Sequence, residues 1–289
     1  MQSLLYGLIA ALAWGLHDFC VRHLSQRLPA ATMLLAGLTA GSLVLAALLL
    51  ATGATVPVSG RAALFALASG GCYALACIGL YKAFAIGPVR LVAPICGAYP
   101  VLSFALAALS GQPITPGQWL AALAVIAGIA LVARQSGAEA DNASRSTAIG
   151  WAALGATGFA LTFALGQNGV HSAGQQAAAG SAELTITLLA RLAAVLLVGA
   201  WVLRARLPLA PLRPHLPLLA LMGMLDVSAM AFVLAAGGLA NPEFAAVSSS
   251  LFGLVTILLA WRFLREPMQP PQWAGVGMVF SGIGWLAAS

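Results

Sequence analysis

Charged side chains are scarce in this chain. Asp, Glu, Lys and Arg together make up 7% of its 289 residues, whereas hydrophobic residues make up 61%. An ordinary soluble domain has about 25% charged residues, and the mean hydropathy here is +0.98. No soluble fold could cover so much apolar surface, so the sequence excludes a soluble globular domain and predicts an integral membrane protein.

Motifs of common enzyme chemistry are absent as well. The sequence contains no Walker A, H-E-x-x-H or G-x-S-x-G pattern, which argues against ATP hydrolysis and against metal-dependent or serine-based catalysis. Its four cysteines form no C-x-x-C pair, and its four histidines lack metal-ligand spacing. We therefore expect no cofactor and no resident metal, and a membrane-embedded enzyme is the least favoured class.

Ten apolar stretches occupy almost the whole chain. A helix that crosses a bilayer needs roughly 20 apolar residues, and short turns rich in proline and glycine separate the stretches. The sequence predicts an all-α integral membrane protein with ten transmembrane helices. The predicted spans are residues 3–21, 30–51, 61–86, 89–109, 117–134, 147–168, 178–203, 214–238, 243–264 and 270–287.

The last span of each half repeats one pattern. Residues 111–133 and 265–287 match at 8 of 23 positions without a gap, including a shared P-x-x-P-x-Q-W. Because five spans is an odd number, the second half must enter the membrane from the opposite side, as in transporters built from inverted repeats. We predict two inverted five-helix repeats, at residues 1–134 and 148–289, joined by a polar linker at 135–147.

Basic residues gather on one side of the predicted membrane. Eleven Arg or Lys side chains fall at the loops that follow odd-numbered spans, whereas only Arg61 falls on the other side. The positive-inside rule then puts both termini outside the cytoplasm. Because these basic residues are scattered singly at helix ends, the net charge of +6 indicates no nucleic-acid partner.

Short motifs are distributed over both halves. They are Ala13-Trp14-Gly15, Ala93-Pro94, Tyr99-Pro100, Glu266-Pro267 and Gln272-Trp273. With the layout of ten spans in two halves, they resemble the drug/metabolite transporter superfamily, specifically its ten-span EamA-type exporters. The resemblance implies a multi-pass protein of a bacterial cytoplasmic membrane that moves small metabolites. It also implies termini in the cytoplasm, in contrast to the charge count.

Charged residues within spans are costly and are functional candidates. Asp226 and Arg191 lie near mid-membrane in predicted spans eight and seven, either as a switchable, proton-coupling pair or as a static salt bridge. His17 and Asp18 could relay protons or bind substrate. The alternative for the second pair is a solvated turn in which Asp18 pairs with Arg22, four residues along.

Aromatic, amide and hydroxyl side chains mark a candidate substrate cavity, because polar groups in hydrocarbon must face protein or water. For the serine in this set, backbone-bonded packing is the alternative. We expect the cavity between spans one, three, four, six, eight and nine, with spans five and ten as peripheral packing. Besides His17 and Asp18, the candidates are Trp14, Tyr73, Cys77, Tyr81, Tyr99, Gln167, Asn168 and Ser249.

These observations favour a secondary transporter that works by alternating access. Amino acids or related polar or amphipathic solutes are the first substrate hypothesis, with export as the expected direction. Proton coupling, coupling to another solute and passive transport all stay open, as do a monomer and a homodimer. The alternative functions are a membrane channel or a non-transporting membrane component. The expected partners are the lipid bilayer and a small-molecule substrate, with protons added if transport is proton-coupled.

Overall fold

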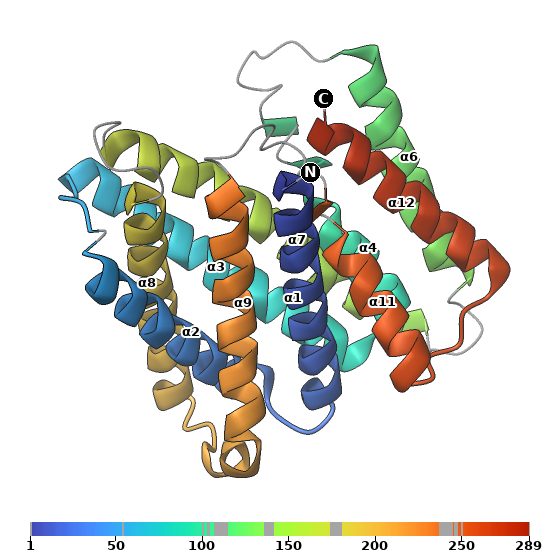
Figure 1. The fold of residues 1–289 in the computed structure, drawn as a ribbon. Coiled ribbons are helices and arrows are strands. Elements are labelled where there is room, and N and C mark those ends of the chain that lie inside the picture. The colour runs from blue at the N-terminus through green and yellow to red at the C-terminus, as the bar shows by residue number, and fades with distance from the viewer. Residues whose placement is uncertain are drawn as a thin grey trace.

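A computed structural model describes residues 2–53, 55–99, 101–102, 105–106, 115–135, 142–173, 181–236, 245, 248–249 and 251–288. All regular structure within these residues is helical (Figure 1). The elements are α1 (Gln2–Ser25), α2 (Ala30–Thr52), α3 (Gly60–Ile86), α4 (Val89–Gly97), α6 (Pro116–Gln135), α7 (Asn142–Ala173), α8 (Ser181–Arg204), the 3-10 helix η2 (Ala210–His215), α9 (Leu216–Ala236), α11 (Phe252–Phe263) and α12 (Pro270–Ala288).

Among the described residues, seven helical segments are long and apolar enough to cross a membrane. They are α1, α2, α3, α6, α7, α8 and the continuous segment formed by η2 and α9, while α11 is a shorter apolar helix. These helices agree with the prediction of an all-α, multi-pass membrane protein. The count of ten spans stays a prediction, because parts of predicted spans four and nine lie outside the described residues.

The described helices differ from the predicted continuous spans in three places. Helix α4 ends at Gly97, and a turn at Ala98 interrupts predicted span four before helical residues resume at Tyr99. Pro94 inside α4 removes one backbone donor and weakens the helix. Helix α11 begins at Phe252, after a turn at Leu251, and the described residues 245 and 248–249 of predicted span nine are also helical. Helix α7 begins at Asn142 and so includes part of the predicted linker, of which residues 136–141 lie outside the described residues. Hydropathy located the apolar part of α7 but not its polar first turns.

Helices of the two halves pack against one another in matching pairs. Helix α3 packs on α7, as α9 packs on α1. The contact of α3 with α8 corresponds to the contact of α9 with α2. The contact of α4 with α7 corresponds to the contact of α11 with α1. Three further contacts, α2 with α8, α4 with α11 and α6 with α12, join helices at equivalent places in the two halves.

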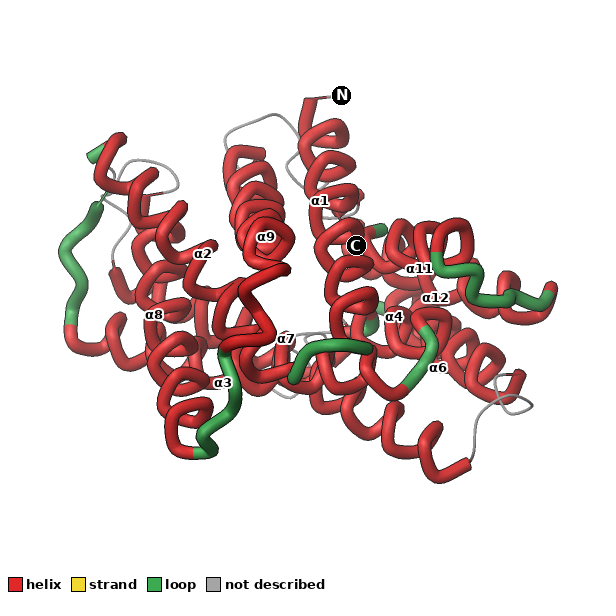
Figure 2. Tube along the Cα trace, turned by 90° about the horizontal axis from the view of Figure 1, so that it is seen from below, coloured by secondary structure: helices red, strands yellow, loops and turns green. Residues whose placement is uncertain are grey.

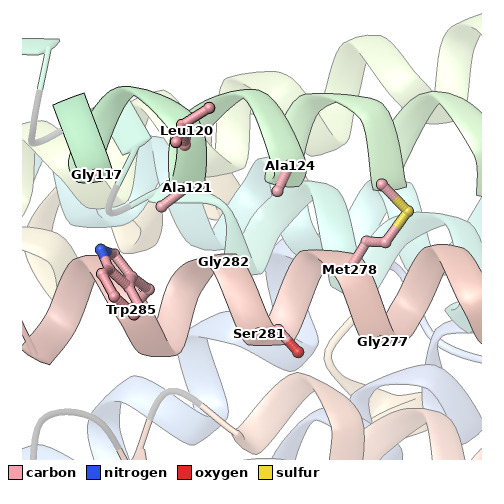
Figure 3. Close-up of a pocket in the computed structure, with 9 residues that line it drawn as sticks. All are labelled: Gly117, Leu120, Ala121, Ala124, Gly277, Met278, Ser281, Gly282 and Trp285. Carbon is pink, nitrogen blue, oxygen red and sulfur yellow. The ribbon is translucent and has the colours of Figure 1, made fainter.

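Helices α6 and α12 form a separate antiparallel pair at one edge of the bundle (Figures 1 and 2). A Cβ on Gly117 would lie 3.3 Å from Trp285 Nε1, and one on Gly128 would lie 2.6 Å from Gly275 O. Glycine thus lets the two backbones touch. The groove between them is apolar along most of its length and carries no charged side chain (Figure 3).

One end of the bundle collects the basic residues. The Lys82 ammonium lies 4.1 Å from the ring centre of Trp151 and 5.7 Å from that of Trp201, which brings together the last turns of α3 and α8 and the early turns of α7. Arg22, near the end of α1, reaches the turn between α11 and α12. We call this end the basic end; the N- and C-termini lie at the opposite end (Figure 1).

Candidate functional site

Asp226 is the centre of a buried polar cluster. It lies ten residues from each end of α9 (226 − 216 and 236 − 226), and its side chain is 15% exposed. Trp14 Nε1 donates to its Oδ1 at 2.9 Å, and the Tyr73 hydroxyl donates to its Oδ2 at 3.1 Å. Arg191 pairs with the same Oδ2. Helices α1, α3, α8 and α9 therefore meet at one carboxylate, which we call the Asp226 cluster.

Arg191 supplies the only positive charge in direct contact with this carboxylate among the described residues. Its side chain is 4% exposed, and its guanidinium lies 5.7 Å from the ring centre of Tyr73. Within the part of the chain that the structure describes, neither Arg191 Nη1 nor Ser42 Oγ has a hydrogen-bond partner. A buried donor without a partner costs about 1–3 kcal/mol. The Asp226 cluster thus retains donor capacity that a bound solute or water could use.

A second cluster lies nearer the basic end. His17 Nδ1 lies 3.0 Å from Asp18 Oδ1, and the Tyr81 hydroxyl lies 3.3 Å from His17 Nε2. Asp18 is 5% exposed, so it does not occupy a solvated turn. The alternative pairing of Asp18 with Arg22 is wrong, because Arg22 binds Glu266 instead.

Helical spacing explains why these side chains point inward together. Trp14, His17 and Asp18 follow i, i+3, i+4 spacing on α1, and Tyr73, Cys77 and Tyr81 follow i, i+4, i+8 spacing on α3. Each set therefore occupies one helix face. The α3 set connects the two clusters, because its first member binds Asp226, its last contacts His17, and Cys77 is buried between them.

Aromatic rings extend the Asp226 cluster toward α7. The Tyr73 ring centre lies 6.3 Å from that of Phe159, and Phe159 lies at the same distance from Tyr99. Tyr99 also stacks on Phe163, with centres 5.1 Å apart. Tyr99 therefore joins the site through α7 phenylalanines, which were not among the predicted site residues.

The remaining candidates are Gln167, Asn168 and Ser249. Gln167 and Asn168 are exposed, and Asn168 donates to Ala164 O of its own helix at 2.8 Å. Ser249 is buried at 8% exposure. The neighbouring Ser248 donates to Leu4 O on α1 at 3.1 Å, which is the backbone-bonded packing considered as the alternative for these serines.

A network at the basic end was missed by the sequence reasoning. Glu266 accepts from Arg22 Nε at 2.9 Å and from the backbone N–H of Val89 at 2.8 Å. Arg90 Nη1 donates to Pro267 O at 2.8 Å, and Arg22 also donates to Phe84 O. This Glu266 network ties α1, α3 and α4 to the turn before α12. The Glu266-Pro267 motif was its one sequence signal, but nothing local indicated the partners.

Metal binding finds no support in the described residues. No group of three or more His, Cys, Asp or Glu side chains there could hold an ion. The described site residues form a charged and aromatic cluster inside the helical bundle.

The sequence matches the EamA-like transporter family over residues 1–134 and 146–288. The chain belongs to this family. This EamA-like protein is therefore a membrane transporter, with a small-molecule substrate and the lipid bilayer as its partners. A channel or a non-transporting component is not favoured.

A solved structure shares the fold of this EamA-like chain. The likeness has a TM-score of 0.68 at 14% sequence identity, and it covers 98% of this chain and 94% of the other. At that identity the likeness concerns the fold alone. No curated protein matches the chain.

Proposed function

We propose that this EamA-like transporter is a secondary transporter that exports amino acids or related polar or amphipathic solutes by alternating access. One observation carries the proposal: Asp226, halfway along α9, is held by side chains from α1, α3 and α8. Charges this deep in a membrane protein are expensive and mark solute or proton pathways. Trp14, Tyr73 and Tyr99 would supply flat amphipathic rings for the organic part of the solute.

We further infer that the ten spans form two inverted repeats. The matching helix pairs support a two-fold relation between the halves. The directions of equivalent helices support inversion: α6 runs antiparallel to α12, and α1 ends at the basic end where the early turns of α7 lie. The repeats are residues 1–134 and 148–289, with 135–147 between them.

The Glu266 network would act as a gate at the basic end. It joins α1, α3 and α4 to the turn that follows α11, so it holds both halves together there. Opening toward this side requires Glu266 to release Arg22 and Val89 together. In the described arrangement the gate is closed, and solute would exchange with the opposite side.

Proton coupling would act through Asp226. A proton on this carboxylate cancels the charge that holds Arg191, Trp14 and Tyr73, and the bundle could then rearrange. The His17–Asp18–Tyr81 cluster lies between Asp226 and the basic end and would pass the proton along. By the positive-inside rule the basic end faces the cytoplasm, so the termini lie outside a bacterial cytoplasmic membrane.

Flux in proteoliposomes tests the proposal. Purified protein is first screened by thermal shift against amino acids and other small metabolites, and the solutes that stabilise it are then tested for uptake. We expect saturable, solute-specific counterflow that a pH gradient accelerates. Flux that rises without saturation and shows no counterflow would indicate a channel instead. Loss of counterflow in Trp14→Ala, without loss of folded protein, would link the flux to the Asp226 cluster.

A further inference from the structure

The turn between α11 and α12 forms a basic hollow at the edge of the basic end. Its lining comprises Trp261, Arg262, Arg265, Glu266 and Pro267, around a cavity of about 430 Å³. This turn lies at the side of the bundle, far from the Asp226 cluster on α9 (Figure 1). Glu266 and Pro267 also belong to the Glu266 network, so the hollow adjoins the proposed gate, while its two arginines take no part in that network or in the Asp226 cluster.

The two arginines of this hollow have no acidic partner in the described part of the chain. Glu266 is the acid nearest to them in the sequence, and both of its oxygens are engaged elsewhere, Oε1 by Arg22 and Oε2 by the Val89 N–H. The guanidinium of Arg262 lies 5.4 Å from the ring centre of Phe263. The hollow therefore presents two exposed guanidinium groups whose charge is not neutralised within the described residues.

The backbone holds this hollow in a fixed shape. The N–H groups of Leu264 and Glu266 both donate to Ala260 O, at 3.0 and 3.3 Å. Arg265 takes a φ of +56°, a left-handed conformation that residues other than glycine seldom adopt. Pro267 is held from the other side through its carbonyl by Arg90.

Aromatic side chains place the hollow at the boundary between hydrocarbon and water. The Trp261 ring packs edge-on against Trp273, with centres 5.9 Å apart. Trp261 is 48% exposed and Phe263 is 63% exposed. Tryptophan is enriched at the level of the lipid headgroups, and a guanidinium binds phosphate oxygens through two parallel hydrogen bonds. If the phosphate group of a ligand reached these arginines, the hydrocarbon part of that ligand would lie beside the exposed rings of Trp261 and Phe263.

We propose that this hollow binds the phosphodiester group of an anionic membrane lipid. Arg262 and Arg265 take the phosphate oxygens, and Trp261 and Phe263 contact the upper part of the acyl chains. Basic pockets between transmembrane helices on the cytoplasmic side bind such headgroups in other membrane proteins. The proposal concerns a structural lipid, so it holds whether or not the chain exports the solutes proposed above.

Native mass spectrometry of the full-length protein in detergent tests this site. Phosphatidylglycerol is titrated against the native chain, with phosphatidylcholine as the zwitterionic comparison. We expect saturable binding of phosphatidylglycerol, and the double variant Arg262→Gln/Arg265→Gln should weaken it at least tenfold. Thermal melting shows whether each variant is folded. If the double variant does not fold, the single variant Arg265→Gln replaces it in the binding test.

The matched control removes two arginines from another turn at the basic end. Arg204 is the last residue of α8 and Arg206 follows it; both are exposed, and Arg206 shares the left-handed backbone, with a φ of +50°. The double variant Arg204→Gln/Arg206→Gln should bind phosphatidylglycerol as the native chain does. An equal loss of phosphatidylglycerol binding in both double variants would mean that binding depends on the overall charge of the protein. That result would overturn the proposal.

Soluble glycerol phosphate distinguishes a lipid from a free phosphate compound. Because it lacks acyl chains, it should displace phosphatidylglycerol only at concentrations several orders of magnitude above that of the lipid. Displacement at equal concentration would assign the hollow to a soluble phosphate ligand, and equal binding of phosphatidylcholine would show that the arginines do not select charge. Either result would overturn the lipid assignment.

Discussion

Trp14 and Asp226, 212 positions apart in sequence, meet through a hydrogen bond of 2.9 Å from the indole Nε1 to the carboxylate Oδ1. The bond joins the middle of α1 to the middle of α9. Tyr73 and Arg191 both contact the other carboxylate oxygen, Oδ2. A change of charge at Asp226 would therefore be felt by three other helices at once.

Asp226→Asn keeps the shape of the side chain and removes its charge. We predict that this variant loses pH-driven accumulation of solute in proteoliposomes and retains some downhill exchange. The variant leaves the Arg191 charge buried without a counterion, which costs about 3–5 kcal/mol in other proteins. The double variant Arg191→Gln/Asp226→Asn should therefore melt at a higher temperature than Asp226→Asn alone.

Glu183→Gln is the matched control for that experiment. Glu183 is in the first turn of α8 and has no part in the Asp226 cluster. Its variant should accumulate solute as the native protein does. If Asp226→Asn also kept full pH-driven accumulation, the carboxylate would be structural, and Asp18 and His17 would be the next residues to test.

Glu266→Gln should open the basic end. The substitution removes the ion pair with Arg22, whose Nε lies 2.9 Å from Glu266 Oε1. Cys20, two residues before Arg22 on α1, is buried at 6% exposure and reports on the opening. With the other three cysteines replaced by alanine, an impermeant thiol reagent added at the basic end should label Cys20 about tenfold faster, as expected for a loss of about 1.4 kcal/mol.

Arg27→Gln is the control for this labelling. Arg27 is exposed near the same end and does not contribute to the Glu266 network. Its loss should leave the labelling rate of Cys20 unchanged. Equal rates in the native background, Glu266→Gln and Arg27→Gln would show that the Glu266 network is not a gate.

The helices were predictable because apolar length and turn residues determine them locally. Residues 30–51 were predicted as a span, and α2 is Ala30–Thr52. The prediction failed where local signals conflict with packing or solvent. Span four was predicted as one continuous helix on hydropathy, whereas a turn at Ala98 interrupts it soon after Pro94. Helix α7 continues beyond its predicted end at 168 to Ala173.

The site was predictable only in part, for a related reason. Asp226 and Arg191 could be paired because both are charged and lie at similar depth in apolar spans. Arg22 was assigned to its nearest acid along α1, whereas its partner Glu266 is 244 positions away. A contact of that separation depends on the arrangement of the whole bundle. Gln167 and Asn168 were chosen by residue type, which does not determine the helix face.

Two adjacent glycines of α3 should differ sharply in their tolerance of alanine. A Cβ on Gly70 would overlap Ala190 O and lie 2.8 Å from Ala193 Cβ on α8, whereas a Cβ on Gly71 would lie 3.7 Å from its nearest neighbour, Leu197 Cδ1. We expect Gly70→Ala to destabilise the protein by about 1–3 kcal/mol, as overpacking does. Gly71→Ala should be neutral or stabilising by up to about 1 kcal/mol. Thermal melting in detergent measures both, and equal melting temperatures would contradict the close α3–α8 contact.

Reporter fusions test the orientation. If the basic end faces the cytoplasm, the C-terminus lies outside, because it is at the opposite end of the bundle (Figure 1). A C-terminal alkaline phosphatase fusion should then be active and a green fluorescent protein fusion dark. The reverse pattern would put both termini in the cytoplasm and the Glu266 network at the outer surface.

Lys82 is the one lysine of the chain, and its ammonium lies over the rings of Trp151 and Trp201. The whole protein thus offers a single side-chain amine to acylating reagents. That amine sits where α3, α7 and α8 converge, so its rate of acylation would follow the separation of these three helices. The acylation rate of Lys82 in the native chain would therefore report the movement of its two halves without any engineered label.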